Sequence, residues 1–278
     1  MKEFRDRVAV VTGAASGIGR GLAARCAREG MKVVMADIEE AALREAAGEL
    51  AAAGAAVLAV PTDVSSWDSV LHLADTAFSA WGGVHLLCNN AGVNTNVSMR
   101  EPLWEHSLDD WDWVTGINLW GVIHGIKAFL PRMLALGDEG HVVNTASMAG
   151  LIAEAKLVIY ATTKAAVVKL SEGLYLQLRE AKAPVGASVY CPAFVSSQLG
   201  VAERNRPGGV TSAGGGRPTL GKLFSDVPVI TPEQSADIVF EAVREERFYV
   251  WTDPLVPKLF RQLSENILAG KNPEPPRN

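Results

Sequence analysis

Two spacings of apolar residues alternate along the chain. Short continuous runs rich in valine and leucine recur, and between them apolar residues return every three or four positions. Such runs are typical of strands buried on both faces, and the second spacing is typical of helices that cover a sheet. The pattern predicts strands at 7–12, 32–37, 56–60, 84–89, 141–146, 186–191 and 248–251. It predicts helices at 17–29, 39–53, 66–80, 111–136, 157–181 and 232–245.

This alternation indicates an α/β protein with a doubly wound, mostly parallel sheet of seven strands and helices on both faces. No linker rich in proline and glycine divides the series, so we expect residues 1–278 to form one domain. Residues 196–228 break the rhythm, since they are rich in glycine and proline and follow a strand directly. Ligands bind at that edge of such sheets, so we expect a substrate lid there, with plain disorder as the alternative. The tail, 270–278, is expected to fray.

Composition narrows the function classes. The net charge of −5 gives no electrostatic reason to expect nucleic acid or an anionic membrane as a partner. The start, "MKEFRDRVAVVTG", has charges where a signal peptide needs an apolar run, and polar residues interrupt the apolar helix at 111–136. Cys26, Cys88 and Cys191 are scattered without the spacing of a metal site, as in buried cysteines of a reducing compartment. We therefore expect a cytoplasmic protein.

The stretch "VVTGAASGIGRG" follows the first predicted strand and opens the first helix. Gly13, Gly17 and Gly19 there allow a tight turn and a close approach of the backbone to a pyrophosphate at the helix N-terminus. A glycine run is a weak signal alone, but the strand before it and the helix after it make it specific.

Asp37 ends the second predicted strand. A carboxylate at this position accepts hydrogen bonds from the hydroxyls of an adenosine ribose and repels a 2′-phosphate. Arg44 is the first basic residue after it, so the sequence favours NAD over NADP. Asp37 can also serve as the N-cap of the helix that starts at Glu39, and the two roles are compatible.

The stretch "YATTK" places Tyr160 and Lys164 one helical turn apart on the same face. Alone, this pair is most simply an aromatic ring packed beside a lysine stem on a solvated face. Tyr175 and Arg179 have the same spacing, so spacing does not select a site. Only Tyr160 has a serine, Ser147, thirteen residues earlier at the end of a predicted strand. A nearby ammonium favours the phenolate, so we expect Lys164 to lower the pKa of Tyr160.

Four motifs together resemble the short-chain dehydrogenase/reductase family. They are "TGAASGIG" at 12–19, "NNAG" at 89–92, Ser147, and "YATTK" at 160–164. The resemblance covers residues 5 to about 200 in order and with the expected spacing. It implies a Rossmann-type domain that binds the dinucleotide and carries the catalytic residues. It also implies NAD or NADP as cofactor and the interconversion of alcohols and carbonyls as the reaction.

The resemblance assigns catalytic roles to four residues. Tyr160 is the acid/base, and Lys164 both supports its ionisation and holds the nicotinamide ribose. Ser147 orients the substrate oxygen, although a serine at a strand end can also be a simple turn residue. Asn118 would hold a water that links Lys164 to solvent, although a buried amide in an apolar helix can also be a structural contact.

The resemblance also assigns cofactor contacts. Asp63 matches the position that holds the adenine, with Val64 behind it, although Asp63 can also be a helix N-cap or a turn residue. Backbone of the "NNAG" motif would run against the cofactor, while Asn89 ties strands together. The residues expected to hold NAD are Gly13, Ser16, Gly17, Ile18, Gly19, Asp37, Ile38, Asp63, Val64, Asn90, Ala91, Gly92, Tyr160, Lys164, Val195 and Ser197.

One position departs from the family pattern, which has Pro-Gly where this chain has Pro192-Ala193. The added methyl group can narrow the pocket but removes no catalytic group. The substrate walls are expected to be apolar, which suits a bulky or aromatic alcohol. The expected wall residues are Val93, Met148, Phe194, Leu199, Leu220, Leu223 and Phe224.

The lid sequence "AERNRPGG" and the chain start also resemble dehydrogenases that oxidise benzylic alcohols of lignin-type aryl ethers. Arg204 and Arg206 in this lid can instead contact an acidic group or be solvated.

We therefore expect an NAD-dependent enzyme that interconverts a secondary alcohol and a ketone. Two alternatives stay open: a cofactor-binding regulatory protein without catalysis, and an enzyme that uses NAD for epimerisation or dehydration. The helices at 111–136 and 157–181 are apolar around most of their circumference. In the family the corresponding helices pack against a partner subunit, so we expect a homodimer or homotetramer.

Overall fold

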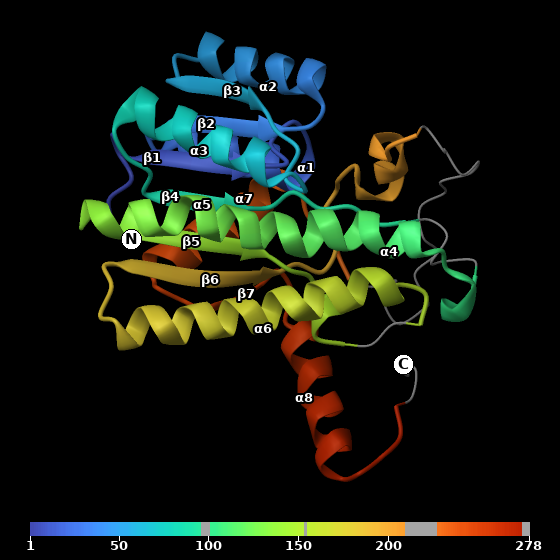
Figure 1. Cartoon of the computed structure of the whole chain (residues 1–278). Coiled ribbons are helices and arrows are strands. Elements are labelled where there is room, and N and C mark those ends of the chain that lie inside the picture. The colour runs from blue at the N-terminus through green and yellow to red at the C-terminus, as the bar shows by residue number, and fades with distance from the viewer. Residues whose placement is uncertain (96–100, 153–154, 209–226, 274–278) are drawn as a thin grey trace.

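The computed structural model describes residues 1–95, 101–152, 155–208 and 227–273. Its strands form one sheet in the order β3-β2-β1-β4-β5-β6-β7, and every neighbouring pair is parallel (Figure 1). This confirms the predicted fold class, and each predicted strand lies within two residues of an observed one. The strands are β1 (Val8–Thr12), β2 (Lys32–Asp37), β3 (Val57–Pro61), β4 (Leu86–Asn89), β5 (Gly140–Thr145), β6 (Val185–Cys191) and β7 (Tyr249–Trp251).

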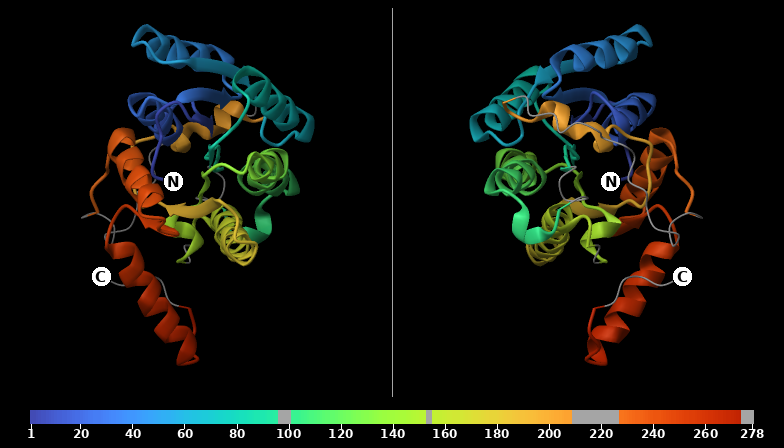
Figure 2. Two further views of the ribbon diagram at one scale, coloured as in Figure 1. Left: turned by 90° about the vertical axis from the view of Figure 1, so that its left-hand side faces the viewer. Right: turned by 90° about the vertical axis from the view of Figure 1, so that its right-hand side faces the viewer.

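Helices cover both faces of the sheet, as the end-on views in Figure 2 show. One buried cluster joins α1, α2 and α7 to residues such as Val11 and Met35, and a second joins α3, α5 and α6 to Val10 and Val34. Successive strand residues thus face opposite clusters, which explains the continuous apolar runs. The helices are α1 (Gly17–Arg28), α2 (Glu40–Ala52), α3 (Trp67–Trp81), α4 (Leu108–Thr115), α5 (Gly121–Leu136), α6 (Val158–Glu180), α7 (Pro232–Arg244) and α8 (Leu255–Leu268).

The helix predicted at 111–136 is interrupted. It begins earlier, at Leu108, because Ser107 and Asp110 form a capping box at its start. A π-helical turn, Gly116–Trp120, separates α4 from α5 and contains the buried Asn118. π-Turns frequently occur at functional sites because they redirect side chains from a regular helix.

The combined helix Leu108–Leu136 is, among the described residues, the one long and apolar enough to cross a membrane by length and composition. A core helix passes the same test. Val122, Phe129 and Met133 of this helix are buried in the protein, and Val122 packs in a cluster with Val189 of the sheet. Burial in the fold accounts for part of its apolar composition, since 39% of its most apolar window is buried.

Helix α8 is a difference from the predicted elements, which end at the last strand. It extends away from the sheet at the end of the described chain (Figure 1). Its first turns contribute Val256 and Leu259 to a small buried cluster with Met148 and Ile152. The base of α8 therefore supports the loop that follows Ser147.

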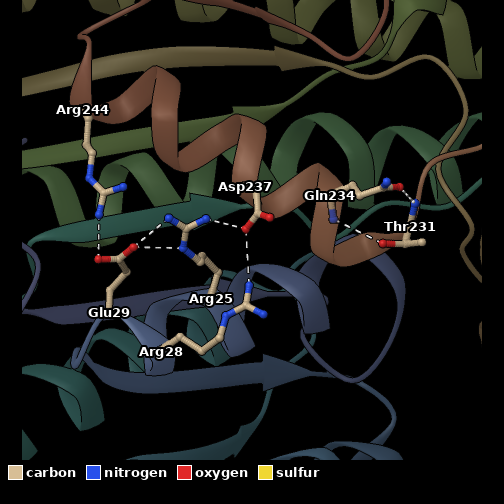
Figure 3. Close-up of polar contacts among 7 residues, drawn as sticks. All are labelled: Arg25, Arg28, Glu29, Thr231, Gln234, Asp237 and Arg244. Atoms are coloured by element: carbon tan, nitrogen blue, oxygen red, sulfur yellow. Dashed lines mark hydrogen bonds and ion pairs between the residues drawn. The ribbon is translucent and has the colours of Figure 1, made fainter.

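Ion pairs and close backbone contact fix α7 on α1 (Figure 3). Arg25 of α1 binds Glu29 at 2.7 Å and also pairs with Asp237 of α7, while Arg244 reaches Glu29 at 2.7 Å. A Cβ atom on Gly21 would lie 2.4 Å from the carbonyl oxygen of Pro232, so the two helices meet where α1 has no side chain. This contact fixes the start of α7.

The segment before α7 runs beside the chain that leaves β6. Val195 and Ile230 form a parallel bridge, in which Ser196 donates to the carbonyl of Ile230 at 3.0 Å. A capping box between Thr231 and Gln234 then starts the helix (Figure 3). The strand-end segment that holds Val195 is therefore anchored on one side by α7.

All three cysteines are buried, as predicted.

Candidate active site

A cleft opens at the carboxyl edge of the sheet, above the ends of β1, β4, β5 and β6. It brings together all the predicted cofactor and catalytic residues except Gly19 and Asn118, which lie just behind its wall. The lining residues are Gly13, Ser16, Gly17, Ile18, Asp37, Ile38, Glu39, Thr62, Asp63, Val64, Asn90, Ala91, Gly92, Val93, Ile117, Thr145, Ala146, Ser147, Tyr160, Lys164, Pro192, Ala193, Val195, Ser197, Gln198, Leu199, Ala202, Arg204 and Asn205.

The glycine loop has the geometry of an anion cradle. Gly13 and Gly17 have φ values of 66° and 51°, which disfavour any residue with a side chain. A Cβ atom on Gly19 would lie 2.0 Å from the carbonyl oxygen of Gly13, so this position also requires glycine. The first N–H groups of α1 have no acceptor within the helix and face this end of the loop.

Asp37 connects the loop to β2. Its carboxylate accepts hydrogen bonds from the backbone N–H of Ala15 at 2.9 Å and from that of Glu39 at 3.0 Å. Burial raises the pKa of this carboxyl group, and the backbone hydrogen bonds oppose that rise. The N-cap of α2 is Glu39, two residues after Asp37, so the prediction that Asp37 is the N-cap of this helix is wrong.

The "NNAG" segment is held by side chains of the sheet. Thr12 Oγ1 accepts from the backbone N–H of Asn90 at 2.9 Å and from that of Ala91 at 3.1 Å. Asn89 donates to Asn144 Oδ1 at 2.9 Å, which confirms that it ties β4 to β5. The backbone of this segment is therefore fixed along the cleft.

Tyr160, Ser147 and Lys164 meet at the inner end of the cleft. They come from the first turn of α6, the end of β5 and the next turn of α6, and they are 8%, 7% and 2% exposed. The Lys164 ammonium donates to the carbonyl oxygen of Thr145 at 2.9 Å and lies 5.6 Å from the centroid of the Tyr160 ring. Tyr160 is hydrogen-bonded to Ser147.

Burial has the largest effect on the pKa values of Tyr160 and Lys164. It raises the pKa of Tyr160 to about 12, and the hydrogen bond with Ser147 offsets only part of the rise. It lowers the pKa of Lys164 to about 8. The expected lowering of the Tyr160 pKa by Lys164 is therefore not what this structure shows, because loss of solvation outweighs a charge 5.6 Å away from the ring.

Asn118 is fully buried on the π-turn and bonded to protein. Its Oδ1 accepts from the N–H of Val93 at 2.8 Å, and its amide donates to the carbonyl of Val93 at 2.9 Å and to Thr163 at 3.1 Å. A Cβ atom on Gly92 would lie 3.3 Å from Lys164 Nζ and 3.4 Å from Asn118 Oδ1. Asn118 thus positions the strand-end backbone next to Lys164, and its amide holds that backbone directly.

Asp63 and Val64, expected at the adenine, and Val195 and Ser197, which follow β6, also line the cleft. Asp63 accepts from the N–H and the hydroxyl of Ser65, at 2.9 and 2.6 Å, so it forms a turn, and Ser66 is the N-cap of α3. A Cβ atom on Gly17 would lie 2.9 Å from Cβ of Ser197. The phosphate loop and the chain after β6 therefore approach each other across the cleft.

Apolar residues line part of the described cleft, namely Val93, Ile117, Leu199 and Ala202, and of the expected wall residues Val93 and Leu199 are among them while Met148 and Phe194 are not. Val93, Val114, Ile159 and Ala202 form one buried cluster, flanked by two partly buried tryptophans. Met148 and Phe194 belong to the cluster at the base of α8. The expected lid residues Leu220, Leu223 and Phe224 lie outside the described residues.

The start of the expected lid is a 3₁₀ helix, η5 (Leu199–Asn205), which lines the cleft. Its neighbour Arg206 forms an ion pair with Asp110, and Arg204 forms one with Glu39. Both guanidinium groups have carboxylate partners within the protein, so neither is simply solvated. Sequence reasoning missed Glu39 as a residue of the cleft, because nothing in the sequence pairs it with a residue 165 positions away.

Known proteins match this chain over most of its length. The family model described as short chain dehydrogenase matches residues 7–207. The 1-deoxy-11-beta-hydroxypentalenate dehydrogenase of Streptomyces avermitilis is 40% identical over 253 residues, which are 90% of this chain and 86% of that protein. The C alpha-dehydrogenase of a Sphingobium species is 35% identical over 260 residues, which are 92% of this chain and 83% of that protein.

Among solved structures, a short chain dehydrogenase/reductase from Burkholderia phymatum in complex with NAD is similar over the full length of both chains. Its TM-score is 0.90, it is 43% identical, and 100% of each chain is covered.

Proposed function

We propose, since this chain belongs to the short-chain dehydrogenase/reductase family of oxidoreductases, that it uses NAD to interconvert a secondary alcohol and a ketone. The observation that carries the proposal is the convergence of Tyr160, Ser147 and Lys164 at the inner end of a cleft whose outer end has a glycine cradle and Asp37. A proton-transfer group and a dinucleotide site thus share one cleft, as hydride transfer requires.

The residues of the outer cleft fit a dinucleotide. Gly13, Gly17 and Gly19 leave open backbone beside the N-terminus of α1, where a pyrophosphate is stabilised by unpaired N–H groups. Asp37 lies at the end of β2, where a carboxylate accepts from ribose hydroxyls. A 2′-phosphate there would face a carboxylate, which favours NAD over NADP.

At the inner end, the chain's own residues handle one proton. In alcohol oxidation, the substrate hydroxyl loses its proton to Tyr160 Oη, while Ser147 Oγ donates to the substrate oxygen and orients it. Lys164 holds its ammonium 5.6 Å from the centroid of the Tyr160 ring and would hold the nicotinamide ribose of a bound cofactor. Asn118 keeps the backbone of Val93, a residue of the cleft, in place.

When bound, NAD⁺ would supply the hydride acceptor and a positive ring charge near the phenol. A positive charge favours the phenolate, so the pKa of Tyr160 in the working complex should lie below the value of about 12 that burial produces alone. Ser147 contributes in the same direction through its hydrogen bond. Oxidation of the alcohol should therefore accelerate as pH rises.

The substrate we propose is bulky and apolar or aromatic. Val93, Ile117, Leu199 and Ala202 line the cleft with apolar side chains. The relatives named above are a dehydrogenase of a hydroxypentalenate and a C alpha-dehydrogenase. A sugar would require polar partners where these apolar side chains line the cleft.

A panel of secondary alcohols and ketones, followed at the nicotinamide absorbance with NAD and NADP, tests the proposal. We expect turnover of aryl or polycyclic alcohols with NAD and little turnover of sugar alcohols. A regulatory protein without catalysis would bind NAD and turn over none of them. An epimerase or dehydratase would convert its substrate without net change in nicotinamide absorbance, and either result would contradict the proposal.

A further inference from the structure

Helix η5 extends along the outer part of the cleft. Four of its residues line the cleft: Leu199, Ala202, Arg204 and Asn205. The same cleft is lined on its β2 side by Asp37, Ile38 and Glu39. The segment therefore lies across from the end of β2, where we place the adenosine ribose.

Two residues of η5 converge on one carboxylate. The guanidinium of Arg204 donates from Nε to Glu39 Oε2 at 3.2 Å and also pairs with Oε1 through Nη2. Asn205 donates to Glu39 Oε1 at 2.9 Å. The remaining Nη1 of Arg204 donates to the carbonyls of Gln198 and Val201, at 3.2 and 3.0 Å. The bonds to Gln198 and Val201 hold the guanidinium against the backbone of η5 and orient it toward Glu39.

The two partners are charged at neutral pH. Burial of the Glu39 side chain acts to raise its pKa, but the hydrogen bonds from Arg204 and Asn205 and the charge of Arg204 bring it below the ordinary value. The side chains of Arg204 and Glu39 are 34% and 28% exposed, so solvent screens this pair only in part.

The other side of η5 is anchored independently. Arg206 pairs with Asp110 of α4, and these side chains are only 14% and 5% exposed. Ala202 packs in the cluster of Val93 and Ile159. Loss of the Glu39 contact would therefore free η5 on the β2 side while α4 still holds its other side.

From this arrangement we propose that Glu39, Arg204 and Asn205 form a clasp that closes the adenosine end of the cleft and slows dissociation of the dinucleotide. The clasp joins the start of α2 to η5 at the part of the cleft that Asp37 also lines. Glu39 and Arg204 are positioning residues in this scheme, because neither is needed for proton transfer. The inference rests on the proposed function for the identity of the dinucleotide.

Stopped-flow release of NADH, followed by the fluorescence of its nicotinamide, tests the clasp without any substrate. We expect Glu39→Gln and Arg204→Gln each to raise the NADH dissociation rate by roughly threefold to tenfold, as for loss of a partly screened, charge-assisted pair. The double variant should be no faster than the faster single variant, since both remove one interaction. In the parent, added salt should raise the NADH dissociation rate, because it screens the ion pair. In Glu39→Gln the dissociation rate should change less with salt concentration.

Glu40→Gln is the matched control. Glu40 follows Glu39 as the first residue of α2 and also forms an ion pair, with Arg44, but it does not line the cleft. Its NADH dissociation rate and salt dependence should equal those of the parent. Equal rates in the parent and in both clasp variants would overturn the proposal. Failure of the parent to bind NADH would instead contradict the proposed function.

Discussion

At the scale of single residues, burial acts in opposite directions on the two ionisable groups of the inner cleft. It raises the pKa of Tyr160 to about 12 and lowers that of Lys164 to about 8. Each shift disfavours the charged form. The site thus holds a buried ammonium at neutral pH at a cost in stability, which suggests that its charge serves function.

This cost leads to a prediction for Lys164→Met. Below about pH 8 the buried ammonium is charged and its penalty is fully present, so the variant should be more stable than the parent near pH 7, by about 2 kcal/mol. As pH rises from about 8 to the ordinary lysine value of 10.5, the folded parent loses its proton before the unfolded chain does, and the parent should regain stability. Chemical denaturation across this pH range measures both.

Lys169→Met is the control for this experiment. Lys169 lies on the same helix, its side chain is 80% exposed, and it pairs with Glu172 at the surface. Its replacement should not change the pH dependence of stability. A Lys164→Met variant that is less stable than the parent at every pH would show that the hydrogen bond to Thr145 outweighs desolvation.

A second residue-scale prediction concerns cofactor selection. Parent kcat/KM should favour NAD over NADP by at least ~10-fold, since an unpaired carboxylate beside a phosphate costs more than ~1.4 kcal/mol. Asp37→Asn keeps the shape of the side chain and removes its charge, so the ratio of the two kcat/KM values should fall toward one. Equal use of both cofactors by the parent would mean that another residue sets the choice.

The sequence predicted which residues line the site better than it predicted their pKa shifts and ion pairs. Glycine spacing, the acidic strand end and "YATTK" located the residues because each signal is local in the chain. The direction of the Tyr160 pKa shift depends on burial by many distant residues, and the Glu39–Arg204 pair joins residues 165 positions apart. No local sequence pattern predicts the direction of this pKa shift or the Glu39–Arg204 ion pair.

At the scale of elements, side-chain caps explain where α3, α4 and α7 begin. The alternating pattern predicted the strands well because a strand buried on both faces needs an apolar residue at every position. Helix α8 was missed although its apolar residues are helically spaced, because only Val256 and Leu259 of it are buried. The π-turn at Asn118 was also missed, since one extra residue in a turn leaves no mark on apolar spacing.

The contact between α1 and α7 supports an element-scale prediction. Gly21→Ala would place a Cβ atom 2.4 Å from the carbonyl oxygen of Pro232, so the helices must separate, and stability should fall by about 1–3 kcal/mol. Gly48→Ala is the matched control, because it adds the same methyl group to the exposed α2 where nothing lies within 4 Å. It should stabilise the protein by roughly 0.5–1 kcal/mol through helix propensity.

Chemical denaturation of both variants tests this prediction. If Gly48→Ala lowered stability as much as Gly21→Ala, the loss in Gly21→Ala would not come from the contact between α1 and α7. Because α7 anchors the segment of Val195, Gly21→Ala should also weaken NAD binding. Gly48→Ala should leave it unchanged.

At the scale of the whole molecule, two helical segments that cover the sheet carry exposed apolar side chains. Trp120 on the π-turn is 51% exposed and Leu176 on α6 is 66% exposed. We propose that these helices pack against a second copy of the chain, in a homodimer or homotetramer, the tetramer being the assembly we favour.

Light scattering after size-exclusion chromatography tests the assembly. We expect a mass of two or four times 29.6 kDa for the parent. Leu176→Glu adds a charge to the expected interface and should shift the population toward smaller species, whereas Leu268→Glu, at the far end of α8, should not. A parent that is monomeric at working concentration would contradict the proposal.

The account as a whole depends on Tyr160 as the acid/base of NAD-linked alcohol oxidation. The most direct measurement is the rate of NADH formation from a saturating aryl secondary alcohol in the parent and in Tyr160→Phe, with NADH binding measured in both. Phenylalanine keeps the ring and removes the proton site, so the rate should fall by about 10²–10⁴ while NADH still binds. If Tyr160→Phe retains more than about a tenth of the parent rate, where general acid–base loss predicts far less, Tyr160 is not the acid/base.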